Sequence, residues 1–233
     1  MLSEAVEDYL KAIYTIKDGV NPVSTSAIAQ RLGVAPASVT QMLKKLADMK
    51  PRLVEYRRHH GVQLTPNGEK IALEVIRHHR LVELFLQEAL GMSWDQVDQE
   101  AERLEHVVSE TLADRMAEVL GHPEFDPHGD PIPSKTGDMP VGKTLLNLVQ
   151  LNPGQDGVVR RVCDDDPEVL RYVASLGIIP KAELKVTAKA PFDGPIHVEV
   201  VFGGGVQTHA LGQRVANQIF VSLNSEDAEP ALG

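Results

Sequence analysis

Hydrophobic residues in the first part of the chain repeat every three or four positions, which is typical of short amphipathic helices. The pattern predicts helices near residues 3–18, 24–33 and 36–49. Two short runs of alternating apolar and polar residues follow, at 53–56 and 62–64, and predict a small hairpin. Helix, helix, tight turn, helix and hairpin is the order of a winged helix-turn-helix.

Two longer segments with helical periodicity come next. Thr65-Pro66 combines an N-cap with a proline suited to the first helical position, and predicts a helix that runs to about Leu90. Ser93-Trp94-Asp95-Gln96 is a capping-box pattern and predicts one further helix that ends near Gly121. Both predicted helices are long and carry apolar stripes, so we expect them to pair with each other and with a second chain.

The pattern changes again after Gly121, where prolines and glycines gather and predict an irregular arm or linker. From Thr144 short β runs prevail, interrupted by a helix near 167–175, which suits a small β-barrel. We therefore expect an α+β chain, with these parts: a winged helix-turn-helix domain at 1–65, a helical dimerisation domain at 66–121, a Pro-rich linker at 122–142, a small β-barrel at 143–224 and a tail at 225–233.

Composition narrows the class of protein. Apolar residues make up 42% of the 233 residues, enough to bury a core. No apolar run approaches the roughly 20 residues that a membrane-spanning helix needs, and no secretory signal opens the chain. Cys163 is the only cysteine, which excludes an internal disulfide. These features predict a cytoplasmic protein without a membrane segment.

Charge is unevenly distributed. The formal net charge is −10, yet residues 1–65 carry nine Lys and Arg against six Asp and Glu. A mildly basic head on an acidic body can bind phosphates locally while the whole chain repels them. The charge pattern therefore favours double-stranded DNA as the partner of the head.

The third predicted helix would enter the major groove with its N-terminal end. Small and hydrogen-bonding side chains there allow close approach to base edges, and Gln41 can pair with adenine. The residues expected to contact DNA are Ala35, Pro36, Ala37, Ser38, Thr40 and Gln41 at base edges, and Lys44, Arg57 and Arg58 at phosphates. The alternative is a protein-interaction module in which Lys44 belongs to a solvated helix face.

Carboxylates and a histidine recur at helical spacing around residue 105. Glu102, Glu105 and His106 would share one face of the predicted helix, and Asp98 would lie one turn back. Carboxylates crowded inside a helical bundle are costly unless they are protonated, paired or bound to metal. A solvated acidic face is the alternative, although four apolar neighbours between 101 and 108 favour an enclosed position.

Two further groups could join such a site. His79 and Glu83 are spaced i,i+4 on the preceding long helix, where a surface ion pair is the alternative. Asp8 lies on the first helix, away from its apolar stripe. Oxygen donors with imidazole, without thiolate or thioether, favour Mn(II) or Fe(II) over thiolate-held Zn(II) or Cu(I).

At this point the chain resembles the diphtheria-toxin-repressor family of metal-dependent transcription regulators, especially its manganese-responsive branch. The resemblance rests on the wing-bearing head and on three motifs: Arg77-His-His-Arg-Leu-Val-Glu83, Glu102-Arg-Leu-Glu-His-Val107 and Asp126-Pro-His-Gly-Asp-Pro-Ile-Pro133. It implies a homodimer joined through the long helices, with two metal positions per subunit. The stretch 176–180 and beyond is similar to the SH3-like, FeoA-type domain of the iron-type members.

The resemblance also implies which residues bind metal: Asp8, Glu102, Glu105 and His106 at a primary position, and His79, Glu83 and Asp98 at an ancillary one. Where iron-type members carry Met and Cys, this chain has Asp8 and Glu102. Lys11 stands where the manganese branch has Glu. Asp164 is a candidate ligand from the C-terminal domain.

The function predicted from the sequence is a Mn(II)- or Fe(II)-dependent repressor of metal-homeostasis genes that binds a pseudo-palindromic operator as a homodimer. The first alternative is a carboxylate-metal enzyme, a di-metal oxidase or a hydrolase. Glu102-x-x-Glu105-His106 lacks the leading His of the H-x-x-E-H hydrolases, and ferritin-like sites need two Glu-x-x-His motifs. The second alternative is a DNA-binding protein that ignores metal.

Overall fold

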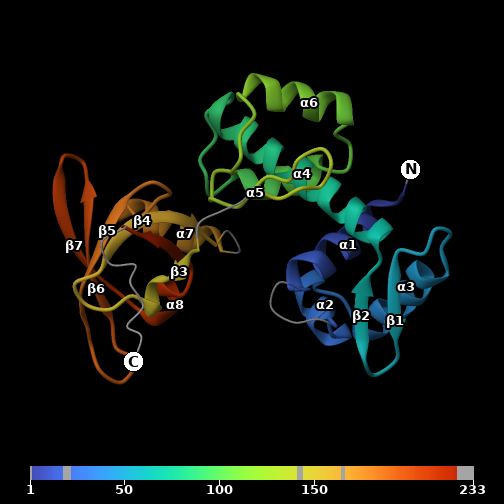
Figure 1. Ribbon diagram of the computed structural model, residues 1–233, viewed down its shortest axis with the longest axis horizontal. Helices are drawn as coiled ribbons and strands as arrows, with labels where there is room; N and C mark the ends of the chain where they lie inside the picture. Colours follow the sequence, from blue (N-terminus) through green and yellow to red (C-terminus); the bar gives the residue numbers. More distant parts are fainter. Residues whose placement is uncertain (1, 18–21, 141–143, 164–165, 225–233) are drawn as a thin grey trace. The chain divides into compact units, whose positions relative to one another are not determined.

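The computed structural model describes residues 2–17, 22–140, 144–163 and 166–224. The chain forms two compact units (Figure 1). The first unit comprises Met1–Val82, Ala101–Val119 and Ile132–Pro140, and the second comprises Glu83–Glu100, Leu120–Pro131 and Val141–Gly233. Within the described residues, no helix is both long and apolar enough to cross a membrane.

The first unit begins with three helices and a hairpin, drawn from blue to teal in Figure 1. The elements are α1 (Glu4–Lys17), α2 (Thr25–Leu32), α3 (Pro36–Asp48), β1 (Val54–Arg57) and β2 (Gly61–Leu64). Ser24 caps α2 by accepting a hydrogen bond from the Ala27 amide at 3.1 Å. The two strands pair antiparallel, so the predicted winged helix-turn-helix order is confirmed.

A single apolar cluster holds this head together. Leu10 and Ile13 from α1 pack with Ile28 from α2 and with Leu43 and Leu46 from α3, and all five side chains are fully buried. Val23, which precedes α2, exchanges two backbone hydrogen bonds of 2.9 Å with Val62 of the wing. The three helices and the wing are therefore held together as one body, so a displacement of α1 would also displace α3.

The long helix α4 (Pro66–Glu88) begins at the predicted N-cap, where the Gly68 amide donates to the Thr65 hydroxyl at 3.2 Å. The prediction of one helix from about 93 to 121 is wrong. The chain instead forms α5 (Val97–Leu104) and α6 (Glu110–Val119), separated by a turn. Two successive β-branched valines after α5 favour helix less than other residues. Ser109 then starts α6 as a new N-cap, accepting from the Leu112 amide at 3.3 Å.

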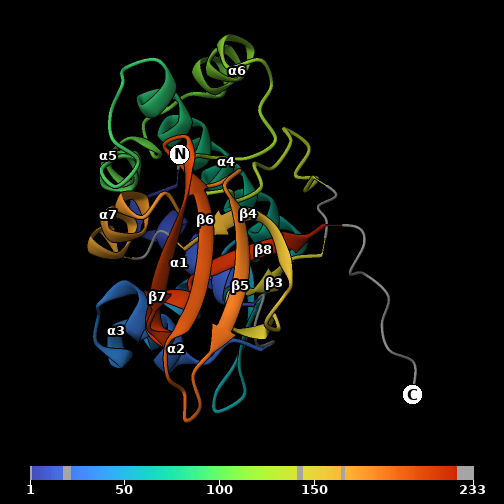
Figure 2. The ribbon, with the colours of Figure 1, turned by 90° about the vertical axis from the view of Figure 1, so that its left-hand side faces the viewer.

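The second unit contains an antiparallel sheet that, among the described residues, has six strands in the order β3-β8-β4-β5-β6-β7 (Figure 2). The strands are β3 (Leu146–Asn147), β4 (Asp156–Val162), β5 (Glu183–Lys189), β6 (Ile196–Phe202), β7 (Gly205–Leu211) and β8 (Ile219–Leu223). Inward-facing Val159, Leu184, Val186 and Val198 are buried in its core.

The helix α7 (Pro167–Ser175) lies where the sequence predicts it. The predicted β runs correspond to β4, β5, β6 and β8, whereas β3, β7, the single turn η1 (Leu148–Gln150) and the short helix α8 (Gln213–Ala216) were missed. β7 was missed because most of its residues are exposed, so it shows no alternation of apolar and polar positions.

The proline-rich stretch after α6 is irregular, as predicted, but part of it is firmly held within the second unit. Asp126 accepts hydrogen bonds from the amides of His128 at 2.8 Å and Asp130 at 2.9 Å. The His128 carbonyl accepts from the Val162 amide of β4 at 2.9 Å. Residues 126–130 are all buried, so this loop is a packed structural element. The domain boundaries proposed above stay a prediction.

Gly129 permits this close packing, and its replacement tests it. At φ +92, a Cβ on Gly129 would lie 1.8 Å from the Arg160 carbonyl oxygen. We expect Gly129→Ala to lower the free energy of unfolding by about 3 kcal/mol or more. The alanine would be strained at this positive φ, and the backbone at Arg160 would also have to move to make room for the Cβ. Gly154→Ala, at φ +95 with no heavy atom within 4 Å, is the matched control and should cost only about 1 kcal/mol. Equal losses in chemical denaturation would contradict the proposed packing.

Candidate metal centre and nucleic-acid interface

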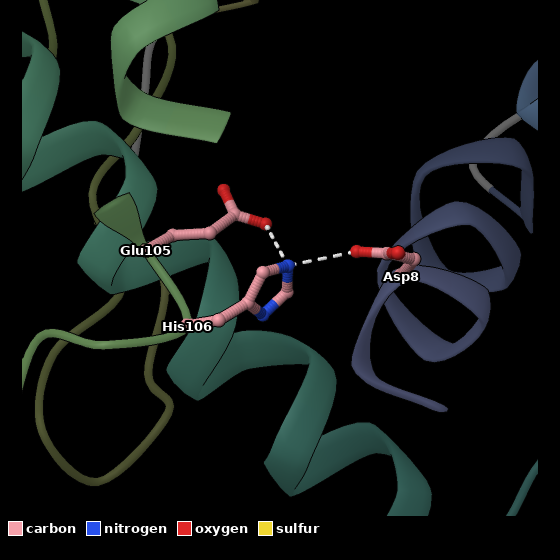
Figure 3. A group of neighbouring side chains, drawn as sticks. All are labelled: Asp8, Glu105 and His106. Atoms are coloured by element: carbon pink, nitrogen blue, oxygen red, sulfur yellow. Dashed lines mark ion pairs between the residues drawn. The ribbon is translucent and has the colours of Figure 1, made fainter. Parts of the chain in front are cut away.

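Three donor side chains of the first unit meet between α1 and the turn after α5 (Figure 3). His106 Nε2 lies 2.8 Å from Asp8 Oδ1 and 3.5 Å from Glu105 Oε1. One ligand atom from each residue lies within 4.8 Å of the others. Two carboxylates and one imidazole in this arrangement are a suitable donor set for a divalent cation.

Glu7 orients the imidazole of this group. Its Oε2 lies 2.7 Å from His106 Nδ1, on the opposite side of the ring from Asp8. A ring that donates from Nδ1 to a carboxylate presents Nε2 as the coordinating atom, the usual outer-shell arrangement of metal-binding histidines. The chemistry of the donor set and its support therefore fit a metal ion.

The same neighbours shift the ionisation of the group. Burial lowers the pKa of His106, but the hydrogen bond to Glu7 and the charges of Glu105 and Asp8 outweigh it, so the pKa is raised. Burial raises the pKa of Asp8 despite the opposing charge of His106. Both shifts mean that protons compete with a cation for these two residues more strongly than in free side chains.

Glu102, predicted as a fourth ligand of the same position, lies beside Lys11, and its role as a ligand stays a prediction. Lys11 Nζ donates to Glu102 Oε1 and to Glu105 Oε2, both at 2.7 Å, and lies 3.1 Å from His79 Nδ1. Glu105 Oε2 is also 2.5 Å from His79 Nδ1. Glu105 therefore faces two neighbouring groups of side chains: its Oε1 faces His106, and its Oε2 faces Lys11 and His79.

Compensating charges keep Glu105 ionised. Burial alone would raise the pKa of its carboxyl, but the hydrogen bond from His79 and the charge of Lys11 outweigh burial, and the pKa is lowered. Burial likewise lowers the pKa of Lys11, and the charges of Glu105 and Glu102 more than offset it. The Lys11–Glu105 pair is thus charged in the folded chain.

The prediction that Glu102, Glu105 and His106 lie on one helix is wrong, although Glu102 and Glu105 do face the same lysine. α5 ends at Leu104, and Glu105 and His106 belong to the turn that follows. The Glu105 amide still donates to the Ala101 carbonyl at 2.9 Å, while the Val107 amide closes a tighter turn onto Leu104 at 3.0 Å. The turn releases His106 from the helix surface and allows it to reach α1.

The predicted ancillary ligands lie on α4 and α5. His79 and Glu83 are one helical turn apart and both are buried. In the second unit, carboxylate oxygens of Glu83 and Asp98 lie within 4.8 Å of one another. The set of His79, Glu83 and Asp98 stays a prediction, and the candidate Asp164 lies outside the described residues.

Sequence analysis missed a buried group in the second unit. Glu83, Asp126 and His128 bring ligand atoms within 4.8 Å of one another, and all three are buried. His128 Nε2 lies 2.8 Å from the Trp94 carbonyl oxygen, and Nδ1 lies 3.4 Å from Glu83 Oε1. Donation from Nε2 to that carbonyl turns the Nδ1 lone pair toward Glu83. The sequence did contain a signal for this group. Asp126 and His128 are two potential metal ligands within the proline-rich stretch, and a segment that only links two domains needs none.

The residues predicted to contact DNA share an exposed surface of the head. Residues 35–38, Gln41, Lys44, Arg57 and Arg58 are exposed, and Thr40 is half-buried with its hydroxyl donating to the Pro36 carbonyl at 3.1 Å. Between α3, the start of α2 and the wing lies a cavity of about 560 Å³. Its lining includes Ser24, Thr25, Thr40, Lys44, Arg58, His59 and His60. A concave surface lined by cations and hydroxyl groups suits a phosphate backbone.

Comparison with known families agrees with this architecture. The family described as iron dependent repressor matches twice: its N-terminal DNA binding domain at residues 1–62 and its metal binding and dimerisation domain at residues 65–134. A FeoA domain matches residues 146–223. The predicted fold class, an α+β chain with a winged head, a helical body and an SH3-like C-terminal domain, is confirmed.

Individual relatives extend over most of the chain. It is 32% identical over 218 residues to the iron-dependent repressor IdeR of Mycobacterium tuberculosis, covering 88% of each chain. It is 35% identical over 133 residues to the diphtheria toxin repressor of Corynebacterium diphtheriae, covering 57% of this chain and 58% of that one.

Solved structures are similar as well. A manganese-dependent transcriptional repressor in complex with manganese superposes with a TM-score of 0.86 at 40% identity, covering 94% of this chain and 100% of that one. ScaR with bound Zn²⁺ superposes with a TM-score of 0.75 at 34% identity, covering 93% and 98%. The chain therefore belongs to the diphtheria-toxin-repressor family of metal-dependent, DNA-binding transcriptional repressors.

Proposed function

We propose that Mn(II) or Fe(II), held by Asp8, Glu105 and His106, activates this repressor, which binds a pseudo-palindromic operator as a homodimer and is not an enzyme. One observation carries the proposal. Asp8 lies on α1 of the DNA-binding head, whereas Glu105 and His106 lie in the turn after α5, outside that head. Shared ligation would couple the two parts.

The donor chemistry supports the choice of metal. Carboxylate oxygens and one imidazole, with no sulfur in the group, suit Mn(II) and Fe(II), which are hard to borderline cations. When bound, the cation supplies the positive charge that offsets repulsion between Asp8 and Glu105. Glu7 holds the imidazole ring of His106 so that Nε2 faces both carboxylates.

The fold offers a route from this group to DNA. α1 packs against α2, which packs against α3, around one buried core. A fixed position of Asp8 therefore fixes the direction of α3. In a homodimer, that direction sets the separation of two recognition helices, which must be about 34 Å for successive major grooves. Metal and operator would then tighten each other's binding by the same factor.

The first prediction concerns metal dependence. In a gel-shift assay with a promoter fragment, Mn(II) should give a specific complex that a chelator abolishes. Glu105→Gln, which removes one charge with little change of shape, should need more Mn(II) and recover DNA binding in excess metal. Gln41→Ala should bind Mn(II) normally, and excess metal should not restore its DNA binding, because groove contacts act after the head is placed. Equal wild-type affinity with chelator and with Mn(II) would instead indicate a DNA-binding protein that ignores metal.

The second prediction separates base contacts from phosphate contacts on α3. Gln41→Ala should weaken binding by about 1–3 kcal/mol at particular bases. Lys44→Ala should weaken all sequences alike and reduce the salt dependence by about one charge. Lys185→Ala, an exposed lysine on β5 in the FeoA-type domain, serves as a control for lost positive charge. The measurement is the affinity of each protein variant for a series of operator variants at two salt concentrations. If Gln41→Ala and Lys44→Ala behave alike, the division into a base contact and a phosphate contact is wrong.

The third prediction follows from the raised pKa values of His106 and Asp8. Both residues must release protons to ligate a cation, so the affinity for Mn(II) should fall as the pH drops below those pKa values. The fall approaches tenfold per pH unit for each proton displaced. His106→Gln should bind Mn(II) less tightly and with a flatter profile between pH 8 and pH 6. Free Mn(II), counted by electron paramagnetic resonance at each pH, measures this, and a flat wild-type profile would exclude His106 as a ligand.

A further inference from the structure

Lys11 occupies a position that the surrounding side chains would otherwise offer to a metal ion. His79, Glu102 and Glu105 bring ligand atoms within 4.8 Å of one another. Lys11 Nζ contacts all three, at 2.7 Å from each carboxylate and 3.1 Å from the imidazole. The lysine side chain is only 15% exposed, so its ammonium is enclosed by these groups.

This position adjoins the group formed by Asp8, Glu105 and His106. Glu105 belongs to both, because Oε1 faces His106 while Oε2 faces Lys11. Two neighbouring cation positions therefore share one buried carboxylate. We infer that Lys11 is the resident cation of the second position, so that the two adjoining positions together take a single divalent ion. The inference adds to the proposed function by stating how many ions this region holds.

Physical reasons favour the ammonium over a second metal ion here. A buried lysine is stable when charge-assisted hydrogen bonds replace its hydration, and Lys11 makes two with carboxylates. An ion ligated by the same oxygens would lie within a few ångströms of the ammonium, and the two cations would repel.

The same contacts give Lys11 a structural effect that needs no metal. Lys11 lies on α1, Glu102 lies on α5, and Glu105 lies in the turn after it. Their ion pairs tie the head to these residues without any contribution from a metal ion. A second divalent ion would need Lys11 to leave, and would therefore lose this link.

The test is to count Mn(II) per chain on the full-length protein, by equilibrium dialysis and electron paramagnetic resonance. Wild type and Lys11→Arg, which keeps the cation, should show magnetically isolated Mn(II) in this region. Lys11→Glu should bind one further ion per chain, with the spectrum of a coupled pair, since ions about 4 Å apart share a carboxylate. Lys11→Gln should bind the same additional ion with lower affinity. This variant tests the role of Lys11 if Lys11→Glu does not fold.

Lys17→Glu is the matched control, because it makes the same charge change on the same helix. Lys17 pairs at 2.5 Å with Glu69, which belongs to none of the candidate metal groups of the described residues, so its replacement should add no ion. An ion at Glu83, Asp126 and His128 would add equally to every variant and leave the differences unchanged.

Two results would overturn the role of Lys11. One is a coupled Mn(II) pair in the wild-type chain, and the other is no added ion in a folded Lys11→Glu or Lys11→Gln variant. A wild-type chain that binds no Mn(II) in this region would contradict the proposed function instead. In that case, an ion gained by Lys11→Glu would still support the assignment of Lys11.

Discussion

The carboxylate of Glu105 is buried, and a buried charge persists only where other charges and hydrogen bonds compensate for the lost water. That compensation comes from Lys11 and His79 on one oxygen and from His106 near the other. These partners come from α1, α4 and the turn after α5. Charge balance at one residue therefore depends on the relative position of the head and the helices that support it.

Glu105 also belongs to the group proposed to bind metal, with Asp8 and His106. The pKa of His106 is raised because Glu7, Glu105 and Asp8 stabilise its protonated form more than burial disfavours it, and the pKa of Asp8 is raised because burial outweighs the charge of His106. A divalent cation bound by these residues would displace their protons and hold both side chains in place. Because α1 shares one core with α2 and α3, a fixed position of Asp8 would also fix α3, the helix proposed to enter the major groove.

The second unit shows the same principle with different residues. Asp126 closes the loop 126–130 with two backbone hydrogen bonds, and the loop docks on β4 through the Val162 amide. The loop carries His128 to Glu83, so a buried imidazole and two carboxylates meet beside the FeoA-type sheet. The proline-rich stretch thus contributes buried polar groups to the interior, where their partners must be supplied by neighbouring elements.

The sequence by itself determined the local elements of the head and the chemistry of the donors. Ser24, Pro36 and Thr65-Pro66 are terminal signals that act within a few residues, and each begins a helix where it was predicted to. Glu105 and His106 were identifiable from residue type and spacing, because hard donors among apolar neighbours are costly without a partner, whereas Asp8 was assigned through the family resemblance. Only the tertiary structure decided how these donors are divided. It ended α5 at Leu104, placed Lys11 between Glu102 and Glu105, and brought His128 to Glu83. Those outcomes depend on contacts between residues far apart in the chain, whose energies no local pattern contains.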